Sequence, residues 1–186
     1  MPSPRTVTDA CGKAAPVLTD SMSPDEALGV LSPGQSAVLG DPARGIITGV
    51  VRYERLAALD EGTPLDEAAE SALLVPAHLT LEQAFHILLA HSEMRWLVSE
   101  TGGLLARAEL VPPPLERFAG VTADRGGLPG DPVAPASGLT YRCPAEPGEH
   151  VFPPSRIEVW TTGLRARCPL DGRLMTAFLP PADDQE

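Results

Sequence analysis

The chain has 186 residues, a length that suits one or two small domains, and 43 % of its residues are apolar, which is enough for a packed core. Only 4 % are aromatic, so valine, leucine, isoleucine and alanine must build that core. The formal net charge of −11 disfavours anionic partners, namely nucleic acids and acidic membrane surfaces.

The first predicted elements are a short strand and a capped helix. Residues 1–14 are polar, and we predict no regular element there. Val17-Leu18 predicts a strand. The run Ser23-Pro24-Asp25-Glu26 combines an N-cap serine, a proline at the first helical position and a glutamate three residues after the cap, which indicates a helix start. Ser32-Pro33-Gly34 ends this helix.

A hairpin and two helices are predicted next. The β-branched run at residues 45–51 predicts a strand that pairs with a strand at residues 36–39, across a turn rich in glycine and proline. Residues 52–59 then predict a helix. A threonine and a proline at residues 63–64 indicate the start of a further short helix.

The same pattern then occurs a second time. Residues 73–85 align with residues 16–28, which lie 57 positions earlier, and Thr80-Leu81-Glu82-Gln83 is another capping box. Strands are predicted after its helix, at residues 95–98 and 103–107. A unit of this length that occurs twice indicates one supersecondary structure used in duplicate, so we predict two packed copies with a cleft between them.

The last third of the chain differs from the first two. Its first part is rich in glycine and proline and predicts a linker, and short strand-like segments follow at residues 139–141, 156–160 and 173–178. The predicted fold class is therefore α/β (α+β), with a duplicated pair followed by a small, mostly-β module. The predicted boundaries are 10–118 for the pair (repeat 1 about 10–60, repeat 2 about 64–112), 119–138 for the linker and 139–180 for the module.

The duplicated unit resembles a CBS-domain pair (a Bateman module) over about residues 10–112. The β-α-β-β-α order matches, as do the phrases Gly45-Ile46-Ile47-Thr48 and Gly103-Leu104-Leu105-Ala106-Arg107-Ala108-Glu109-Leu110. The resemblance implies two copies packed through their sheets, with clefts that often hold adenosyl nucleotides. In the family, a Ser/Thr hydroxyl meets phosphate and an Asp carboxylate accepts from the ribose hydroxyls.

The sequence departs from that family pattern in both copies. The first copy keeps Thr48 but has Val51 at the position of the Asp, and the second has Ala106 in place of the hydroxyl residue and Glu109 in place of the Asp. The alternative is that Thr48 is only a strand residue and Glu109 a solvated one. The candidate ligand-binding residues are Thr48, Glu109, Asp41 and Arg107.

Three cysteines, an odd number, favour metal binding or burial over a disulfide framework. Cys143-Pro144 and the run Cys168-Pro169-Leu170-Asp171-Gly172 resemble the two knuckles of a degenerate zinc ribbon. Zinc prefers thiolate and imidazole and accepts carboxylate, so the candidate zinc ligands are Cys143, His150, Cys168 and Asp171. Four protein ligands would make the ion structural. The alternative is two cysteines beside proline turns.

A basic group lies beside the second of these knuckles. Arg165, Arg167 and Arg173 are close to Cys168 in the sequence. They could meet a phosphate, although the solvated face of a strand is the more frequent role for such a group.

These features predict a non-catalytic regulatory or sensor protein. Its CBS-like pair would bind a small effector, with an adenine nucleotide as the candidate, and its C-terminal module would contact a protein partner. One alternative is a dimerisation scaffold that has lost its ligand, which the incomplete half-sites favour. A weaker alternative is a metal-dependent enzyme centred on Cys143, His150 and Cys168.

The remaining predictions concern location and assembly. The chain has no run of about 20 apolar residues and no apolar signal core at its N-terminus, which predicts a cytoplasmic protein without a membrane partner. The resemblance to CBS pairs implies a homodimer.

Overall fold

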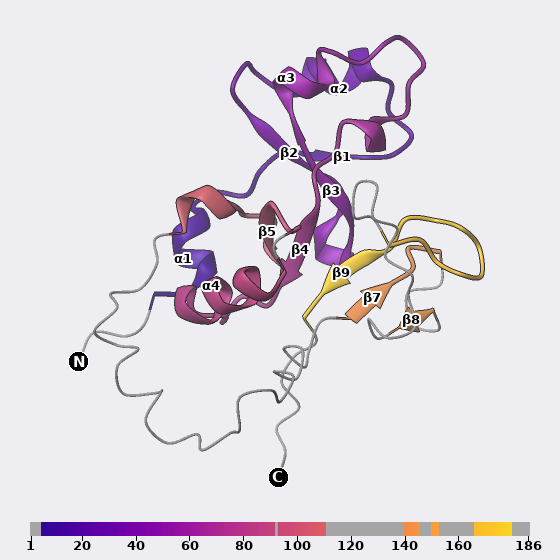
Figure 1. Cartoon of the computed structure of the whole chain (residues 1–186). Coiled ribbons are helices and arrows are strands. Elements are labelled where there is room, and N and C mark those ends of the chain that lie inside the picture. The colour runs from indigo at the N-terminus through magenta and orange to yellow at the C-terminus, as the bar shows by residue number, and fades with distance from the viewer. Residues whose placement is uncertain (1–4, 92, 111–139, 146–149, 153–165, 180–186) are drawn as a thin grey trace, which may run out of the picture.

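The structure is a computed structural model, and it describes residues 5–91, 93–110, 140–145, 150–152 and 166–179. Within these residues the protein is a mixed α+β fold built from two similar units and a set of C-terminal strands (Figure 1). None of the described helices is long and apolar enough to cross a membrane. The predicted linker and the predicted strand at residues 156–160 lie outside the described residues.

Repeat 1 forms a three-stranded sheet in the order β1-β2-β3, in which β1 is parallel to β2 and β2 is antiparallel to β3. Helix α2 connects β1 to β2. Its capping box is present, because the Ser23 hydroxyl accepts from the Glu26 N–H and the Glu26 carboxylate accepts from the Ser23 N–H. The elements are β1 (Val17–Leu18), α2 (Pro24–Val30), β2 (Ser36–Asp41), η1 (Pro42–Arg44), β3 (Ile46–Arg52) and α3 (Tyr53–Leu56).

Repeat 2 has the same topology, with β4 parallel to β5 and β5 antiparallel to β6. The predicted capping box of Thr80 and Gln83 starts its helix α4. The prediction of a unit used in duplicate is confirmed by this strand order. The elements are β4 (Ala72–Val75), α4 (Leu81–Ala90), β5 (Trp96–Ser99), β6 (Leu104–Ala106) and η3 (Arg107–Glu109).

The prediction of no regular element before residue 15 is wrong. Residues Val7–Cys11 form a helix, α1, which the side chains of Thr6 and Asp9 cap, and Val7 is completely buried. Helix α1 lies against repeat 2, since the Val7 N–H donates to the Leu79 carbonyl (2.8 Å) (Figure 1). A five-residue helix is marginal alone, and tertiary packing stabilises it here.

Each repeat is completed by the segment that precedes the other one. Helix α1 precedes repeat 1 but packs on repeat 2. Conversely, the short helix η2 (Leu65–Glu67) precedes repeat 2, and its Leu65 is buried in the core of repeat 1. Glu70 and Val50 then exchange backbone hydrogen bonds (3.0 and 2.7 Å). This reciprocal arrangement ties the two repeats into one unit.

The sheets of the two repeats pack face to face through a shared apolar cluster. Repeat 1 contributes residues from β2 and β3, repeat 2 contributes residues from β4 and β5, and the C-terminal residues 176–178 contribute one. Burial of such side chains removes apolar surface from water and is the main force that holds the pair together. The cluster contains Val38, Ile47, Val50, Ala72, Leu74, Trp96, Val98 and Phe178.

The C-terminal strands extend the sheet of repeat 2. Strand β9 (Thr176–Phe178) pairs in parallel with β4, β7 (Thr140–Arg142) pairs with β9, and β8 (Val151–Phe152) pairs with β7. The sheet has the order β6-β5-β4-β9-β7-β8. The predicted module at 139–180 therefore shares a sheet with repeat 2, while the exact domain boundaries stay a prediction.

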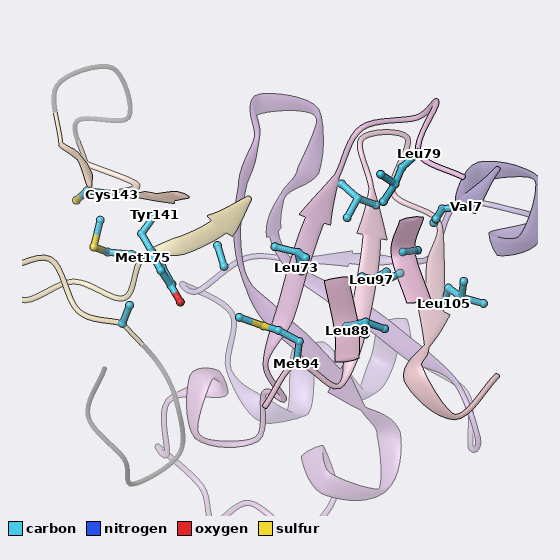
Figure 2. Packing of buried hydrophobic residues seen from close by; sticks show 14 of the residues in the cluster. Val7, Leu73, Leu79, Leu88, Met94, Leu97, Leu105, Tyr141, Cys143 and Met175 are labelled. Carbon is cyan, nitrogen blue, oxygen red and sulfur yellow. The ribbon is translucent and has the colours of Figure 1, made fainter. Parts of the chain in front are cut away.

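The C-terminal strands also share the core of repeat 2. Figure 2 shows Tyr141 and Met175 in the same buried cluster as Leu73 and Met94. Cys143, which is completely buried, lies at the end of this cluster. A side chain that sequence analysis singles out for chemistry is thus positioned by the main core of the protein.

Candidate functional site

The four predicted zinc ligands converge at one place. Cys143 directly follows β7, His150 directly precedes β8, and Cys168 and Asp171 lie in the turn before β9. One donor atom from each of them lies within 4.8 Å of the donor atoms of the others. Residues that are up to 28 positions apart are therefore brought together by the pairing of β7 with β8 and β9.

The distances in this cluster, which we call the Cys2HisAsp cluster, suit a tetrahedral ion. Cys143 Sγ is 3.1 Å from Asp171 Oδ2, Cys168 Sγ is 3.6 Å from His150 Nδ1, and that nitrogen is 4.0 Å from Asp171 Oδ2. Zinc bonds of about 2.0–2.3 Å in a tetrahedron place ligand atoms about 3.3–3.8 Å apart. Small side-chain movements would let all four donors reach one ion.

The backbone around the Cys2HisAsp cluster holds its members in place. The Cys143 N–H donates to the His150 carbonyl (3.0 Å), and the Gly172 N–H donates to the Cys168 carbonyl (2.8 Å). Gly172 has a φ of 74°, a left-handed conformation that glycine adopts without strain and that closes this turn.

The charge state of Asp171 also suits a ligand. Its carboxylate accepts from the Arg173 backbone N–H and from the Cys143 thiol, and these hydrogen bonds lower the pKa of that carboxyl. The donor set therefore fits zinc, which takes thiolate, imidazole and carboxylate ligands.

Thr48 lines a cleft of about 340 Å³ between repeat 1 and the C-terminal strands. Two acidic residues of the cleft, Asp20 and Asp66, come from repeat 1 and from the short helix η2 that packs on it. Two basic residues, Arg167 and Arg173, come from the turn that carries the metal ligands. The cleft thus has an anionic side and a cationic side.

The acidic side of the Thr48 cleft is electrostatically strained. Burial raises the pKa of Asp20, and the nearby negative charge of Asp66 raises it further. The Thr48 hydroxyl gives a long hydrogen bond (3.5 Å) to the Asp20 carboxylate and opposes this shift only weakly. A ligand that donates hydrogen bonds to these carboxylates would relieve the strain.

The other predicted ligand residues do not line this cleft. The Asp41 carboxylate accepts from the Arg44 N–H (3.2 Å) and shapes the turn between β2 and β3. The Arg107 guanidinium donates to the carbonyls of His91 (3.1 Å) and Met94 (3.4 Å), so it holds the end of helix α4. Glu109 is exposed near Cys11.

Val51 is completely buried in the core of repeat 1, so its side chain is not available to a ligand. Sequence reasoning missed Asp20 and Asp66 as cleft residues. No local sequence motif includes both residues. They lie close together because helix η2, which contains Asp66, packs on repeat 1, which contains Asp20.

Several solved structures are similar to this chain, including the following three. The first is the cystathionine beta-synthase pair domain of a putative Mg²⁺ transporter from Shewanella oneidensis MR-1 (20 % identity, TM-score 0.39), which matches 58 % of this chain and 69 % of its own. The second is a CBS domain pair/ACT domain protein from Thermotoga maritima (20 % identity, TM-score 0.38), which matches 63 % of this chain and 99 % of its own.

The third is the cytosolic domain of the Mg²⁺ channel MgtE in complex with ATP (15 % identity, TM-score 0.36), which matches 57 % of this chain and 44 % of its own. No protein-family model and no curated protein matches the chain. Because every TM-score is below 0.5, we base the fold on the strand order and register of this chain itself.

Proposed function

We propose that the chain is a non-catalytic regulatory module of the CBS-pair type, which binds a small effector in the Thr48 cleft. The observation that carries the proposal is the duplicated strand order of two repeats that pack face to face. Repeat 1 of this pair supplies Thr48, the residue that the family resemblance selects, to a cleft that the C-terminal segment closes on the other side.

The charges of the Thr48 cleft suit an adenine nucleotide. Carboxylates accept hydrogen bonds from neighbouring ribose hydroxyls, which Asp20 and Asp66 could do in place of the residue that is Val51 here. Arginine recognises phosphate, which Arg167 and Arg173 could do on the opposite side. Glu109 and Arg107 have no part in this proposal.

The position of the cleft suggests how an effector would act. Its walls come from repeat 1 and from the turn that carries the metal ligands, so a ligand in the cleft contacts both. A ligand shifts a conformational equilibrium only when it binds two arrangements unequally. The C-terminal strands are thus the part whose arrangement an effector would stabilise, and they are the proposed surface for a protein partner.

We propose zinc as the ion of the Cys2HisAsp cluster, with a structural role. Four protein ligands leave no open coordination position, so the ion would not activate water. It would hold the turn that contributes Arg167 and Arg173 to the Thr48 cleft. The homodimer and the cytoplasmic location stay predictions.

Thermal melts with AMP, ATP and S-adenosylmethionine test the proposal. A ligand that binds the folded state raises the melting temperature, and we expect this for at least one of the three. The shift should shrink in Thr48→Val and Arg173→Ala and persist in Arg95→Ala, which changes an exposed arginine outside the cleft. The proposal would be contradicted if a ligand raised the melting temperature equally in all variants, or if no ligand at millimolar concentration raised it in the unmodified protein.

A dimerisation scaffold without a ligand is the second candidate. Val51 and Ala106 favour it, because neither can make the polar contacts of the family. Sedimentation of the full chain distinguishes the two. A stable dimer together with melts that no ligand changes would favour the scaffold.

A further inference from the structure

A second cleft, of about 390 Å³, opens at the carboxyl ends of the parallel strands. Strand β4 is parallel to both β5 and β9, so the residues that end or directly follow these strands meet at one edge. Val75, Glu100 and Leu179 line the cleft from this edge. In sheets of this kind the crevice outside the carboxyl ends of the strands is the usual place for a ligand.

The opposite wall of this cleft, which we call the carboxyl-edge cleft, comes from repeat 1. It is the turn between β2 and β3, and it includes Arg44 and Gly45. The cleft shares no lining residue with the Thr48 cleft. It is therefore a separate place for a ligand.

Arg142 of strand β7 reaches into the carboxyl-edge cleft. Its guanidinium carbon lies 4.3 Å from the centre of the Phe178 ring, which positions the planar group by a cation–π contact. Its Nε is buried and has no hydrogen-bond partner among the described residues. A ligand in the cleft cannot reach this buried Nε itself. The missing acceptor does mean that nothing among the described residues neutralises the guanidinium, whose remaining N–H groups are left to a ligand of the cleft.

The charges around Arg142 favour an anion as that acceptor. Arg44 and Arg142 outnumber the one acid of the cleft, Glu100. The ion pairs found within the described residues involve none of these three side chains. A local excess of positive charge stands out in a chain whose formal net charge is −11.

We propose that the carboxyl-edge cleft binds a small organic anion whose oxyanion, a phosphate or a carboxylate, is held by Arg142 and Arg44. The planar arginine fork suits both oxyanions, since each presents two oxygens to it. The volume of the cleft suits a small molecule rather than a peptide chain. Such a ligand would contact the turn of repeat 1, the edge of repeat 2 and the C-terminal strands at the same time.

Thermal melts with inorganic phosphate and with malonate, each at about 20 mM and at constant ionic strength set with chloride, test this inference on the full chain. At least one anion should raise the melting temperature. A shift with phosphate alone indicates a phosphorylated ligand, and one with malonate alone indicates a dicarboxylate. No shift with either would overturn the inference.

Variants assign the shift to this cleft. Arg44→Ala and Arg142→Gln should each weaken the apparent affinity for the anion about tenfold or more, because a charge-assisted hydrogen bond is lost. Glu100→Gln should strengthen the apparent affinity for the anion, because it removes a negative charge from the cleft. This increase can be measured even if Arg142→Gln fails to fold. Arg95→Ala, at an exposed arginine outside both clefts, should leave the affinity unchanged. A shift that depends on Arg173 and ignores Arg44 and Glu100 would overturn the inference and place the anion in the Thr48 cleft.

Discussion

Thr176 and Ile47 exchange two hydrogen bonds across the boundary between the C-terminal strands and repeat 1. The Thr176 hydroxyl accepts from the Ile47 N–H (2.8 Å) and donates to the Ile47 carbonyl (2.7 Å). Thr176 is 1 % exposed and Ile47 is 2 % exposed, so water cannot replace either bond. Strand β9 is therefore joined to repeat 2 by strand pairing and to repeat 1 by this side chain.

The change Thr176→Val removes both of these bonds and keeps the shape of the side chain. It leaves the buried N–H and carbonyl of Ile47 without a partner, which should lower the free energy of unfolding by about 1–3 kcal/mol. Chemical denaturation measures this loss. Thr19→Val, at an exposed threonine, is the control and should change stability little. Equal stability of both variants would contradict the role of Thr176.

Zinc should copurify with the protein at about one ion per chain, as expected for four converging ligands. Cys168→Ser should abolish this metal content and lower the melting temperature, since binding free energy contributes directly to folding. Elemental analysis gives the content. Cys11→Ser is the control, because Cys11 lies outside the Cys2HisAsp cluster and should keep full metal. Metal content that survives the Cys168 change would leave the cluster without its proposed role.

Cys11 should be an unreactive thiol. Burial, and then the negative charge of Glu109, raise the pKa of the Cys11 thiol to about 11 from its ordinary value of 9.0. The thiolate is the reactive form, so alkylation of the folded protein at neutral pH should be about a hundredfold slower than for an ordinary cysteine. Glu109→Gln should lower the pKa and speed the reaction. A rate equal to that of a free peptide thiol would contradict this environment.

Gly45 tests how the turn of repeat 1 contacts Arg142. A Cβ at this position would lie 2.5 Å from Nη1 of Arg142, and the φ of 69° is itself unfavourable for alanine. Gly34→Ala is the matched control, because Gly34 has a φ of 81° with open space around it. Both changes should lower the free energy of unfolding by about 1 kcal/mol.

The two glycine variants should differ in ligand binding. The guanidinium is the far end of a flexible side chain, so in Gly45→Ala it can move aside and leave the carboxyl-edge cleft. The response to phosphate or malonate should therefore weaken in Gly45→Ala and persist in Gly34→Ala. An unchanged response in both would show that Arg142 does not hold the anion.

A change at Val7 tests whether the N-terminal helix α1 packs on repeat 2. It is completely buried in the core of repeat 2, whereas Val17 is 45 % exposed. Removing buried methyl groups should make Val7→Ala less stable by about 1–3 kcal/mol, and Val17→Ala should have little effect. Denaturation curves compare the two. Similar stability of both variants would mean that α1 does not dock as described.

Elements with strong local signals could be predicted from the sequence. The capping boxes at Ser23 and Thr80 fix the starts of α2 and α4, because side chains three residues apart satisfy the free N–H groups there. The close spacing of Cys168 and Asp171 also gives a local signal. The structure brings these two together with Cys143 and His150, as expected.

Features that depend on long-range pairing could not be predicted. Helix α1 has five residues and no local apolar pattern that would predict it, and it forms because it packs on residues far along the chain. The parallel pairing of β9 with β4 joins residues about a hundred positions apart, and hydrophobic periodicity carries no information about such a partner. The family pattern also suggested Glu109 and Arg107, whereas the structure places Asp20 and Asp66 beside Thr48 instead.

Isothermal titration calorimetry of the metal-loaded full chain with AMP, ATP and S-adenosylmethionine in turn tests the central proposal most directly. We expect saturable binding of at least one of them, at one molecule per chain in the Thr48 cleft, weakened about tenfold or more in Arg173→Ala and unchanged in Arg95→Ala. No saturable binding of any of the three, or equal affinity in both variants, would contradict the proposal that this cleft is an effector site.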